Sequence, residues 1–356
     1  MTPTFESARR VALSRELHAR AEKLALATVA LHYERVPALA VRYGLAGRER
    51  CLEDARYHLS YLQQAVAADS RVLFTSYVQW GRSMLESRGV PVFDLTMNLR
   101  CLIEVLERET ATQAAVSTVH EALLALAGPI PETPTMLEDG NPHAPLAREY
   151  LRLLLSWERR GASQLILEAV AAGAPIRDMY MHVFQPTQYE LGRLWQLNEI
   201  SIAQEHYCTA ATQMIMSQLY PQLFAEPKFG RTMIVSCVSG ELHELGARMV
   251  ADLFELDGWD TVYFGANTPT SALLTAINQR QPVLLAISAT LTVHLDRVRE
   301  LINAVRADSH AASTTIMVGG NCFNRDPGLH LRLGADAHSV DASAAVALAN
   351  MLVEAP

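Results

Sequence analysis

Apolar residues recur every three or four positions along most of the first 127 residues, which is the spacing of one face of an α-helix. The longest such stretches cover residues 5–36 and 95–127. Gly44 and Gly89 interrupt the pattern and predict breaks between helices. We therefore predict an all-helical domain over residues 1–127.

A segment rich in proline, glycine and acidic residues follows at 128–143 and is typical of a linker. Helical spacing returns over residues 144–226, where short connections predict a four-helix bundle. Pro186 predicts a kink or break in the third helix, because proline has no backbone N–H. The four expected helices cover roughly 144–158, 160–172, 175–195 and 199–220.

From residue 231 the period changes, and short apolar runs rich in β-branched residues alternate with helical segments. The expected strands lie within 232–240, 260–265, 283–290 and 314–320, and the expected helices within 243–258, 270–281 and 294–308. Buried strands that alternate with helices indicate a parallel sheet. We predict a flavodoxin-like, doubly wound, Rossmann-like domain over 231–356, and a multidomain α and α/β protein as a whole.

Composition and charge argue against several classes of function. The net charge is −8, with basic residues interleaved among acidic ones, so direct nucleic-acid binding is not expected. No apolar run reaches the roughly 18 residues of a membrane span, and the first residues carry charges in place of a signal-peptide core. The five cysteines form no Cys-x-x-Cys pair, which favours reduced thiols. We expect a cytoplasmic protein without membrane association.

Ligands of a doubly wound sheet bind beyond the carboxyl ends of its strands. Three features fall at that edge: residues 239–246 after the first expected strand, Ser288 to Thr290 after the third, and Gly319-Gly320 after the fourth. Residues 241–246 read Glu-Leu-His-Glu-Leu-Gly, which resembles the Asp-x-His-x-x-Gly motif of cobalamin-binding domains of the methionine-synthase type. Two positions depart from that pattern, since Glu241 replaces the commoner Asp and Thr290 stands where the family has Leu.

The resemblance implies that His243 is the lower ligand of a cobalamin cobalt, in place of the cofactor's own nucleotide base. A neutral imidazole is a suitable cobalt ligand, and a carboxylate at Glu241 can hold its other ring nitrogen. Glycines let the backbone approach a large flat ligand. The expected cofactor-binding residues on this side are Gly240, Glu241, Leu242, His243, Gly246, Ser288, Thr290, Gly319 and Gly320.

Within the bundle, Trp195 is followed after nine residues by Glu205 and His206. This spacing resembles the upper-face signature of CarH-type light sensors, in which the Trp covers the adenosyl group of adenosylcobalamin and the Glu-His pair contacts it. Ser201, with Gln204 three residues later, predicts a capping box that begins a helix just before the pair. The resemblance implies that Trp195, Glu205 and His206 bind adenosylcobalamin.

A photoreceptor is the function that this resemblance implies: light cleaves the cobalt–carbon bond and changes domain packing or oligomeric state. We expect no enzyme activity, since residues 1–226 contain no pattern of a substrate barrel. Gln196 stands where such sensors have a histidine that captures the cobalt after illumination. His182, His206 or solvent remain as alternatives for that role.

The helical first third does not resemble the helix-turn-helix domain of CarH-type proteins. In architecture the chain resembles photocobilins, photoreceptors that bind cobalamin and also biliverdin. An aromatic slot with polar groups suits a bilin, and residues 55–85 supply such groups, although aromatic residues at helical spacing are also usual in a core. The candidates are His58, Tyr61, Tyr77, Trp80 and Arg82, with Cys51 or Cys101 for covalent attachment.

Two other functions stay open. A corrinoid carrier of a methyltransferase system would use the same bundle and sheet, although Trp195 with Glu205 and His206 argues against an exposed upper face. Alternatively, the first third could serve assembly alone. We expect a homo-oligomer, a dimer or higher, that signals to a separate partner whose identity the sequence does not reveal.

Overall fold

The protein is described here by a computed structural model that covers residues 5–109, 113–129, 134–138, 140–224 and 227–354. Two compact units make up the chain. One comprises residues 1–131 with 291–296, and the other residues 132–290 with 297–356. None of the described helices is both long enough and apolar enough to cross a membrane.

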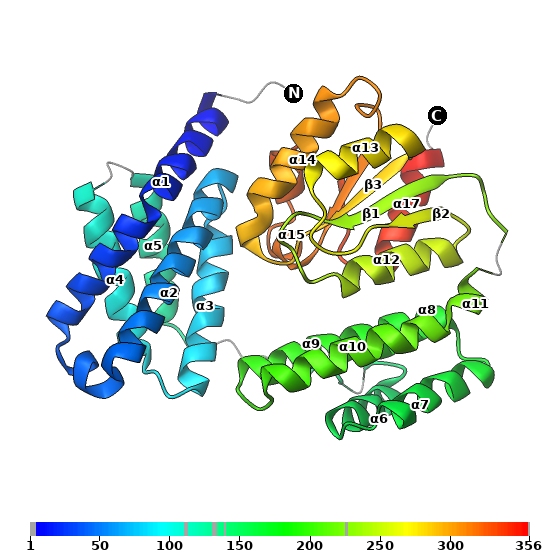
Figure 1. The fold of residues 1–356 in the computed structure, drawn as a ribbon, viewed down its shortest axis with the longest axis horizontal. Coiled ribbons are helices and arrows are strands. Elements are labelled where there is room, and N and C mark those ends of the chain that lie inside the picture. Colours follow the sequence, from blue (N-terminus) through cyan, green and yellow to red (C-terminus); the bar gives the residue numbers. More distant parts are fainter. Residues whose placement is uncertain (1–4, 110–112, 130–133, 139, 225–226, 355–356) are drawn as a thin grey trace. The chain divides into compact units, whose positions relative to one another are not determined.

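The first unit is helical, as predicted (Figure 1). Pro37 lies at the break between the first two helices, and Gly89 (φ 78°) at the break after the third. Gly44 (φ 61°, ψ −158°) kinks the second helix without ending it. The helices are α1 (Phe5–Arg35), α2 (Ala38–Ala68), α3 (Arg71–Ser87), α4 (Val92–Glu109) and α5 (Gln113–Leu126).

Apolar side chains from every one of these helices are fully or almost fully buried, which is the core that the helical spacing predicts. Helix α1 packs against α2 and α4, and α3 packs against α5. Representative core residues are Leu24, Leu62, Phe74, Leu99 and Val119.

The second unit begins with a helical bundle whose third helix is continuous through a π-helical segment. Pro186 has no N–H to bond the carbonyl of His182, and the Asn141 side chain donates to that carbonyl instead, at 2.7 Å. The predicted break at Pro186 is therefore a local change of helix type. The elements are α6 (Ala144–Leu155), α7 (Arg159–Ala171), α8 (Ile176–Asp178), η1 (Met179–Phe184), α9 (Gln185–Gln196), α10 (Ile202–Gln218) and α11 (Tyr220–Leu223).

The described residues just before this bundle pack against it. Leu137 is buried in the bundle core, and the backbone N–H of Met136 donates to Glu190 Oε2 at 3.0 Å. Glu190 is itself buried and pairs with Arg193, whose guanidinium lowers the pKa of that carboxyl against the effect of burial. The described part of the predicted linker thus contributes to the bundle's packing.

A five-stranded parallel sheet with the order β2-β1-β3-β4-β5 follows, which is the flavodoxin-like topology that the sequence predicts. The first four strands fall within the predicted runs. Sequence reasoning missed β5, because a two-residue edge strand carries no apolar run. The strands are β1 (Thr232–Cys237), β2 (Asp260–Tyr263), β3 (Leu284–Ser288), β4 (Thr315–Gly319) and β5 (Ala337–His338).

Helices cover both faces of this sheet, with α12 and α17 packed together on one face and α13 and α14 on the other (Figure 1). The α12 face shares one continuous apolar core with the bundle. Within this core the Tyr180 hydroxyl donates to buried Asp252 of α12 at 2.8 Å. The helices are α12 (Leu245–Leu256), α13 (Thr270–Arg280), α14 (Leu295–Ala307), α15 (Asn321–Arg325), α16 (Leu329–Leu333) and α17 (Ala342–Glu354), with a 3-10 turn, η2 (Thr292–His294), before α14.

Candidate functional site

The carboxyl ends of β1, β3 and β4 meet in register, since Cys237 pairs with Ser288 and Ser288 with Gly319. The chain order reverses between β1 and β3, so the crevice for a ligand is expected at their ends. The loop after β1 turns at Gly240, whose φ of 86° suits glycine. The Gly240 N–H donates to the side chain of Asn267, at 2.8 Å, which fixes this loop to the loop after β2.

His243 and Glu241 form a close polar contact at this edge. Glu241 Oε1 lies 2.6 Å from His243 Nδ1 and accepts the His243 backbone N–H at 3.0 Å. Glu241 Oε2 accepts the backbone N–H of Thr290, from the loop after β3, at 2.8 Å. The Glu241 carboxylate is fully buried, whereas the His243 side chain is 56% exposed. The imidazole is thus held through one nitrogen while Nε2 is directed away from Glu241.

This hydrogen bond, helped by the charges of Glu241 and Glu205 and opposed by partial burial, raises the pKa of His243. With Nδ1 donating to the carboxylate, the neutral imidazole presents its lone pair at Nε2. A buried carboxylate that fixes the tautomer and orientation of a histidine is the usual support of a metal ligand. The residues present therefore fit a metal bound at Nε2 of His243.

Two glycines at this edge differ in what surrounds them. A Cβ at Gly320 (φ 106°) would come within 2.3 Å of the Ala289 carbonyl oxygen, so close strand-end packing requires glycine there. A Cβ at Gly246 would meet nothing within 4 Å. The packing of the chain itself therefore does not require glycine at position 246.

The turn between α9 and α10 carries the other predicted group of residues. The capping box at Ser201 is present, and its side chain accepts the Gln204 N–H at 3.2 Å. Glu205, in the first turn of α10, accepts from His206 Nδ1 at 2.6 Å. Trp195, in the last turn of α9, is partly buried against the bundle core. The charge of Glu205 contributes to the raised pKa of His243, and Gln213 of the same helix donates to Glu244, the residue after His243, at 3.0 Å.

The two histidines considered as alternatives for Gln196 are placed differently. His182 lies in η1, roughly 20 Å along the helix from Gln196 at 1.5 Å per residue, and its ring packs 6.0 Å from that of His143. His206 lies in α10 beside Glu205, and its side chain is 73% exposed. Of the two, only His206 lies beside Glu205, whose charge acts on His243.

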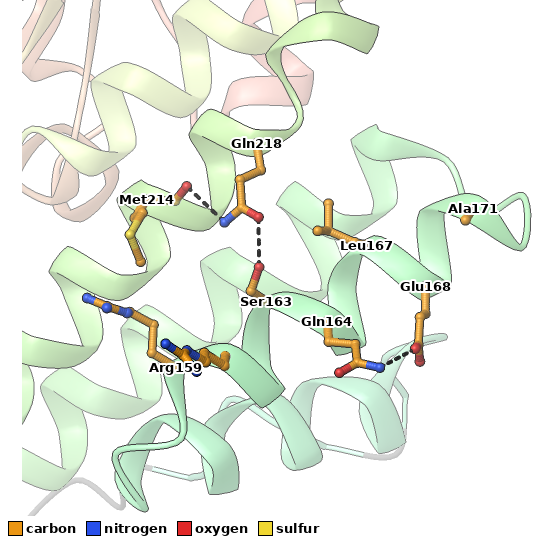
Figure 2. Close-up of a pocket in the computed structure, with 9 residues that line it drawn as sticks. Arg159, Ser163, Gln164, Leu167, Glu168, Ala171, Met214 and Gln218 are labelled. Carbon is orange, nitrogen blue, oxygen red and sulfur yellow. Dashed lines mark hydrogen bonds between the residues drawn. The ribbon is translucent and has the colours of Figure 1, made fainter.

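A separate groove of about 580 Å³ lies between α7 and α10 (Figure 2). Its polar side chains bond to one another, with the Ser163 hydroxyl donating to Gln218 at 2.9 Å and Gln164 donating to Glu168 at 2.7 Å. None of the residues discussed above lines this groove. The lining residues are Arg159, Arg160, Ser163, Gln164, Leu167, Glu168, Ala171, Met214 and Gln218.

In the first unit, three of the predicted bilin-binding residues contact one another. His58 Nδ1 lies 2.8 Å from the Tyr77 hydroxyl, and Tyr61 stacks on Tyr77 with ring centroids 3.8 Å apart. Arg82 donates to the carbonyls of Leu126 and Gly128, at 2.9 and 2.8 Å, and so caps the end of α5. These polar groups already have protein partners.

The remaining bilin candidates give no further support to a bilin site. Trp80 is a partly buried residue of α3. Burial raises the pKa of the Cys51 thiol to about 12, and burial also raises that of Cys101. Because the thiolate is the reactive form, both cysteines have the character of core residues.

The sequence around His243, and the bundle before it, match models of a known protein family. Residues 231–348 match the family model of the B12 binding domain, and residues 146–220 match a second model of the same description. The chain is a cobalamin-binding protein. The first match contains the His243 loop and the second contains α9 and α10, so both groups of predicted residues fall within matches to B12 binding domains.

Similar proteins belong to two functional groups. Monomethylamine corrinoid protein 1 of Methanosarcina acetivorans is 25% identical over 166 residues, 45% of this chain and 76% of that protein. The HTH-type transcriptional repressor CarH of Myxococcus xanthus is 24% identical over 225 residues, 62% of this chain and 67% of that protein. Among solved structures, the Methanosarcina barkeri monomethylamine corrinoid protein superposes with a TM-score of 0.54 at 22% identity, covering 59% of this chain and 99% of the other, and thus shares the fold.

Of the residues that the sequence singled out at this edge, the structure brings Glu241, His243 and Thr290 together, and it adds others that hold the same loops. Glu241 and His243 are hydrogen-bonded to each other, and Thr290 contributes its backbone N–H to the same carboxylate. Asn267 and Glu244 were missed, although both hold the His243 loop. Asn267 lies in the loop after β2, so the rule that ligands gather at carboxyl strand ends could have nominated it.

Proposed function

We propose that this protein is a photoreceptor that binds adenosylcobalamin between the carboxyl edge of the sheet and the α9–α10 turn. The observation that carries the proposal is the arrangement of Trp195 in the last turn of α9 and of the Glu205–His206 pair near the capped start of α10. Similarity to the CarH repressor across 62% of the chain supports it.

The residues would divide the binding between two sides. His243 Nε2 would bind the cobalt, and Glu241 would hold the ring in place. Trp195 would supply an apolar surface for the adenosyl group, and the Glu205–His206 pair would bind ribose hydroxyls. When bound, the cofactor supplies a cobalt–carbon bond that visible light cleaves.

The proposed output is a change in how the bundle packs on the sheet, or in assembly, and no reaction of a separate substrate is proposed. We further propose a homo-oligomer that signals through a separate protein partner, with no direct contact to nucleic acid or membrane. Biliverdin as a second chromophore remains a proposal for the first unit, where His58 and Tyr77 would have to exchange their mutual hydrogen bond for bonds to the bilin.

A corrinoid carrier is the second candidate, favoured by the similarity to the monomethylamine corrinoid protein. A carrier must present the upper face of its corrinoid to partner enzymes, whereas a sensor holds the adenosyl group until light removes it. Preference for adenosylcobalamin over methylcobalamin therefore separates the two functions.

The test is made on the full chain, loaded with adenosylcobalamin in the dark. The absorbance spectrum and the elution volume are recorded before and after illumination, with a methylcobalamin-loaded sample in parallel. A sensor should bind the adenosyl form more tightly, and light should change both its spectrum and its elution volume. Equal affinity for the two cofactors, with an elution volume that light leaves unchanged, would favour the carrier.

A further inference from the structure

Glu244, the residue after the cobalt ligand, joins three parts of the second unit. Its Oε1 accepts a hydrogen bond from the Gln213 side chain of α10 at 3.0 Å. Its Oε2 accepts from the backbone N–H of Ala266 at 3.0 Å and from the Tyr263 hydroxyl at 3.3 Å. One carboxylate therefore ties the His243 loop to a bundle helix and to the loop after β2.

The backbone next to Glu244 leaves room for this carboxylate. Gly265 adopts φ 74°, and a Cβ there would come within 2.9 Å of Glu244 Oε2. Glycine at this position gives the carboxylate room and lets the following amide turn toward it. The contact with Ala266 is thus a built feature of the loop.

Gln213 lies on the same helix as the proposed upper-face residues. It follows Glu205 by eight residues, a distance of roughly 12 Å along α10 at 1.5 Å per residue. A helix segment of this length moves as one body, so a displacement of the α10 N-terminus shifts Gln213 as well. The Gln213–Glu244 hydrogen bond then passes that displacement to the residue beside His243.

We propose that Gln213 and Glu244 are positioning residues that couple the upper-face helix α10 to the loop that carries the lower cobalt ligand. The pair lies outside the expected binding residues on both faces, and it acts through His243. Coupling of this kind is reciprocal: occupation of the His243 side also restrains α10. The inference rests on the proposed role of His243 in cobalamin binding.

Three variants of the full chain test the coupling. Gln213→Glu places a second carboxylate against Glu244 and breaks the hydrogen bond by like-charge repulsion. The double variant Gln213→Glu with Glu244→Gln restores one amide and one carboxylate, now with the amide at position 244 as donor. Ser217→Ala is the matched control, because Ser217 also bonds α10 to α12, through Arg248 at 2.8 Å, but does not contact the His243 loop.

Two measurements are made on each variant. Hydrogen exchange of the amides of residues 241–246 is followed in the cofactor-free protein, and cobalamin titration gives the affinity and the fraction of bound cofactor with the spectrum of a histidine-ligated cobalt. Gln213→Glu should speed exchange of the loop amides several-fold and weaken binding about 10-fold, the equivalent of one lost charge-assisted hydrogen bond. The double variant should recover most of both losses, and Ser217→Ala should match the unmodified protein.

The outcomes separate this inference from the function on which it rests. If the unmodified protein binds cobalamin through His243 but Gln213→Glu changes neither loop exchange nor the histidine-ligated fraction, the coupling is wrong and the cobalamin assignment stands. If Ser217→Ala has the same effect as Gln213→Glu, any loosening of the bundle suffices and the specific pair is refuted. Failure of the unmodified protein to show a histidine-ligated spectrum would contradict the assignment of His243 itself.

Discussion

Each of the two predicted chromophore sites includes a histidine, and the structure gives these two histidines opposite surroundings. His243 has an exposed ring whose pKa is raised by the hydrogen bond to buried Glu241. His58 is buried against Tyr77, and burial lowers its pKa to about 4. The first arrangement offers a fixed ring nitrogen to an incoming ligand, whereas the second satisfies a polar group inside a helical core. Similar residue types thus form two different arrangements. We call the His243–Glu241 pair the prepared site, and the buried group of His58, Tyr61 and Tyr77 the packed cluster.

The strongest test of the prepared site is removal of the ring. We expect His243→Ala to weaken cobalamin binding by roughly 100-fold or more and to abolish the histidine-ligated spectrum, because the alanine side chain has no atom that can bind the metal. Absorbance titration measures both. His206→Ala removes an exposed histidine of α10 and should keep the histidine-ligated spectrum. Loss of that spectrum in the His206 variant alone would reverse the assignment of the lower ligand.

The buried histidine, His58, should instead make the free energy of unfolding of the first unit depend on pH. The folded state keeps His58 neutral down to a pH of about 4, while the unfolded chain takes up the proton near pH 6.5. The stability from this group is therefore present above pH 6.5 and is lost as the pH falls toward 4, by up to about 3 kcal/mol. Hydrogen exchange of the α2 amides between pH 4 and pH 7, corrected for intrinsic rates, measures this slope.

A matched pair of variants assigns the slope to its residue. His58→Gln can still accept from Tyr77 but cannot titrate, so its pH dependence should be flatter than that of the unmodified protein. His120→Gln changes an exposed histidine of α5 and should leave the slope as it is. Equal slopes in the unmodified protein and His58→Gln would contradict the role of His58. Tight, red-shifted biliverdin binding that requires His58 would instead show that the packed cluster opens for a ligand.

The next largest effect on cobalamin affinity is expected at Glu241, which holds the His243 ring. Glu241→Gln keeps the size of the side chain but loses the charge that holds His243 Nδ1 and the Thr290 N–H. We expect cobalamin affinity to fall about 10- to 100-fold, as is usual when the support of a metal-bound histidine is removed. Glu205→Gln, titrated with cobalamin in the same way, is the control. In the proposed site Glu205 binds the adenosyl group, so this variant should lose affinity for adenosylcobalamin and keep the histidine-ligated spectrum. A Glu241→Gln protein with unchanged affinity would mean that the buried carboxylate does not support the ligand.

The sequence predicted the elements whose signal is local. Strands β1 to β4, the capping box at Ser201 and the neighbours Glu241 and His243 all follow from patterns within a few residues. Contacts with a partner far along the chain leave no such local signal. Arg82 is a bilin candidate by residue type, and only the fold shows that it also caps α5 through carbonyls 44 and 46 residues away. Glu244 is an unmarked position of the motif, and only the fold brings Gln213 to it.

The smallest expected effect concerns Trp195, which distinguishes a site that holds cobalamin from one that holds the adenosyl group. In the proposed site Trp195 contacts the adenosyl group and His243 holds the cobalt, so Trp195→Ala should bind methylcobalamin as the unmodified protein does. Loss of the apolar surface that an indole ring provides should reduce the preference for adenosylcobalamin, within about 10-fold. The measurement is the ratio of the two affinities in the dark.

Trp157→Ala is the control, because Trp157 also belongs to the bundle but packs on Tyr207 with an exposed ring. An affinity ratio that is the same in all three proteins would remove the adenosyl contact of Trp195 and leave a site with a prepared lower face alone, which is what a corrinoid carrier needs.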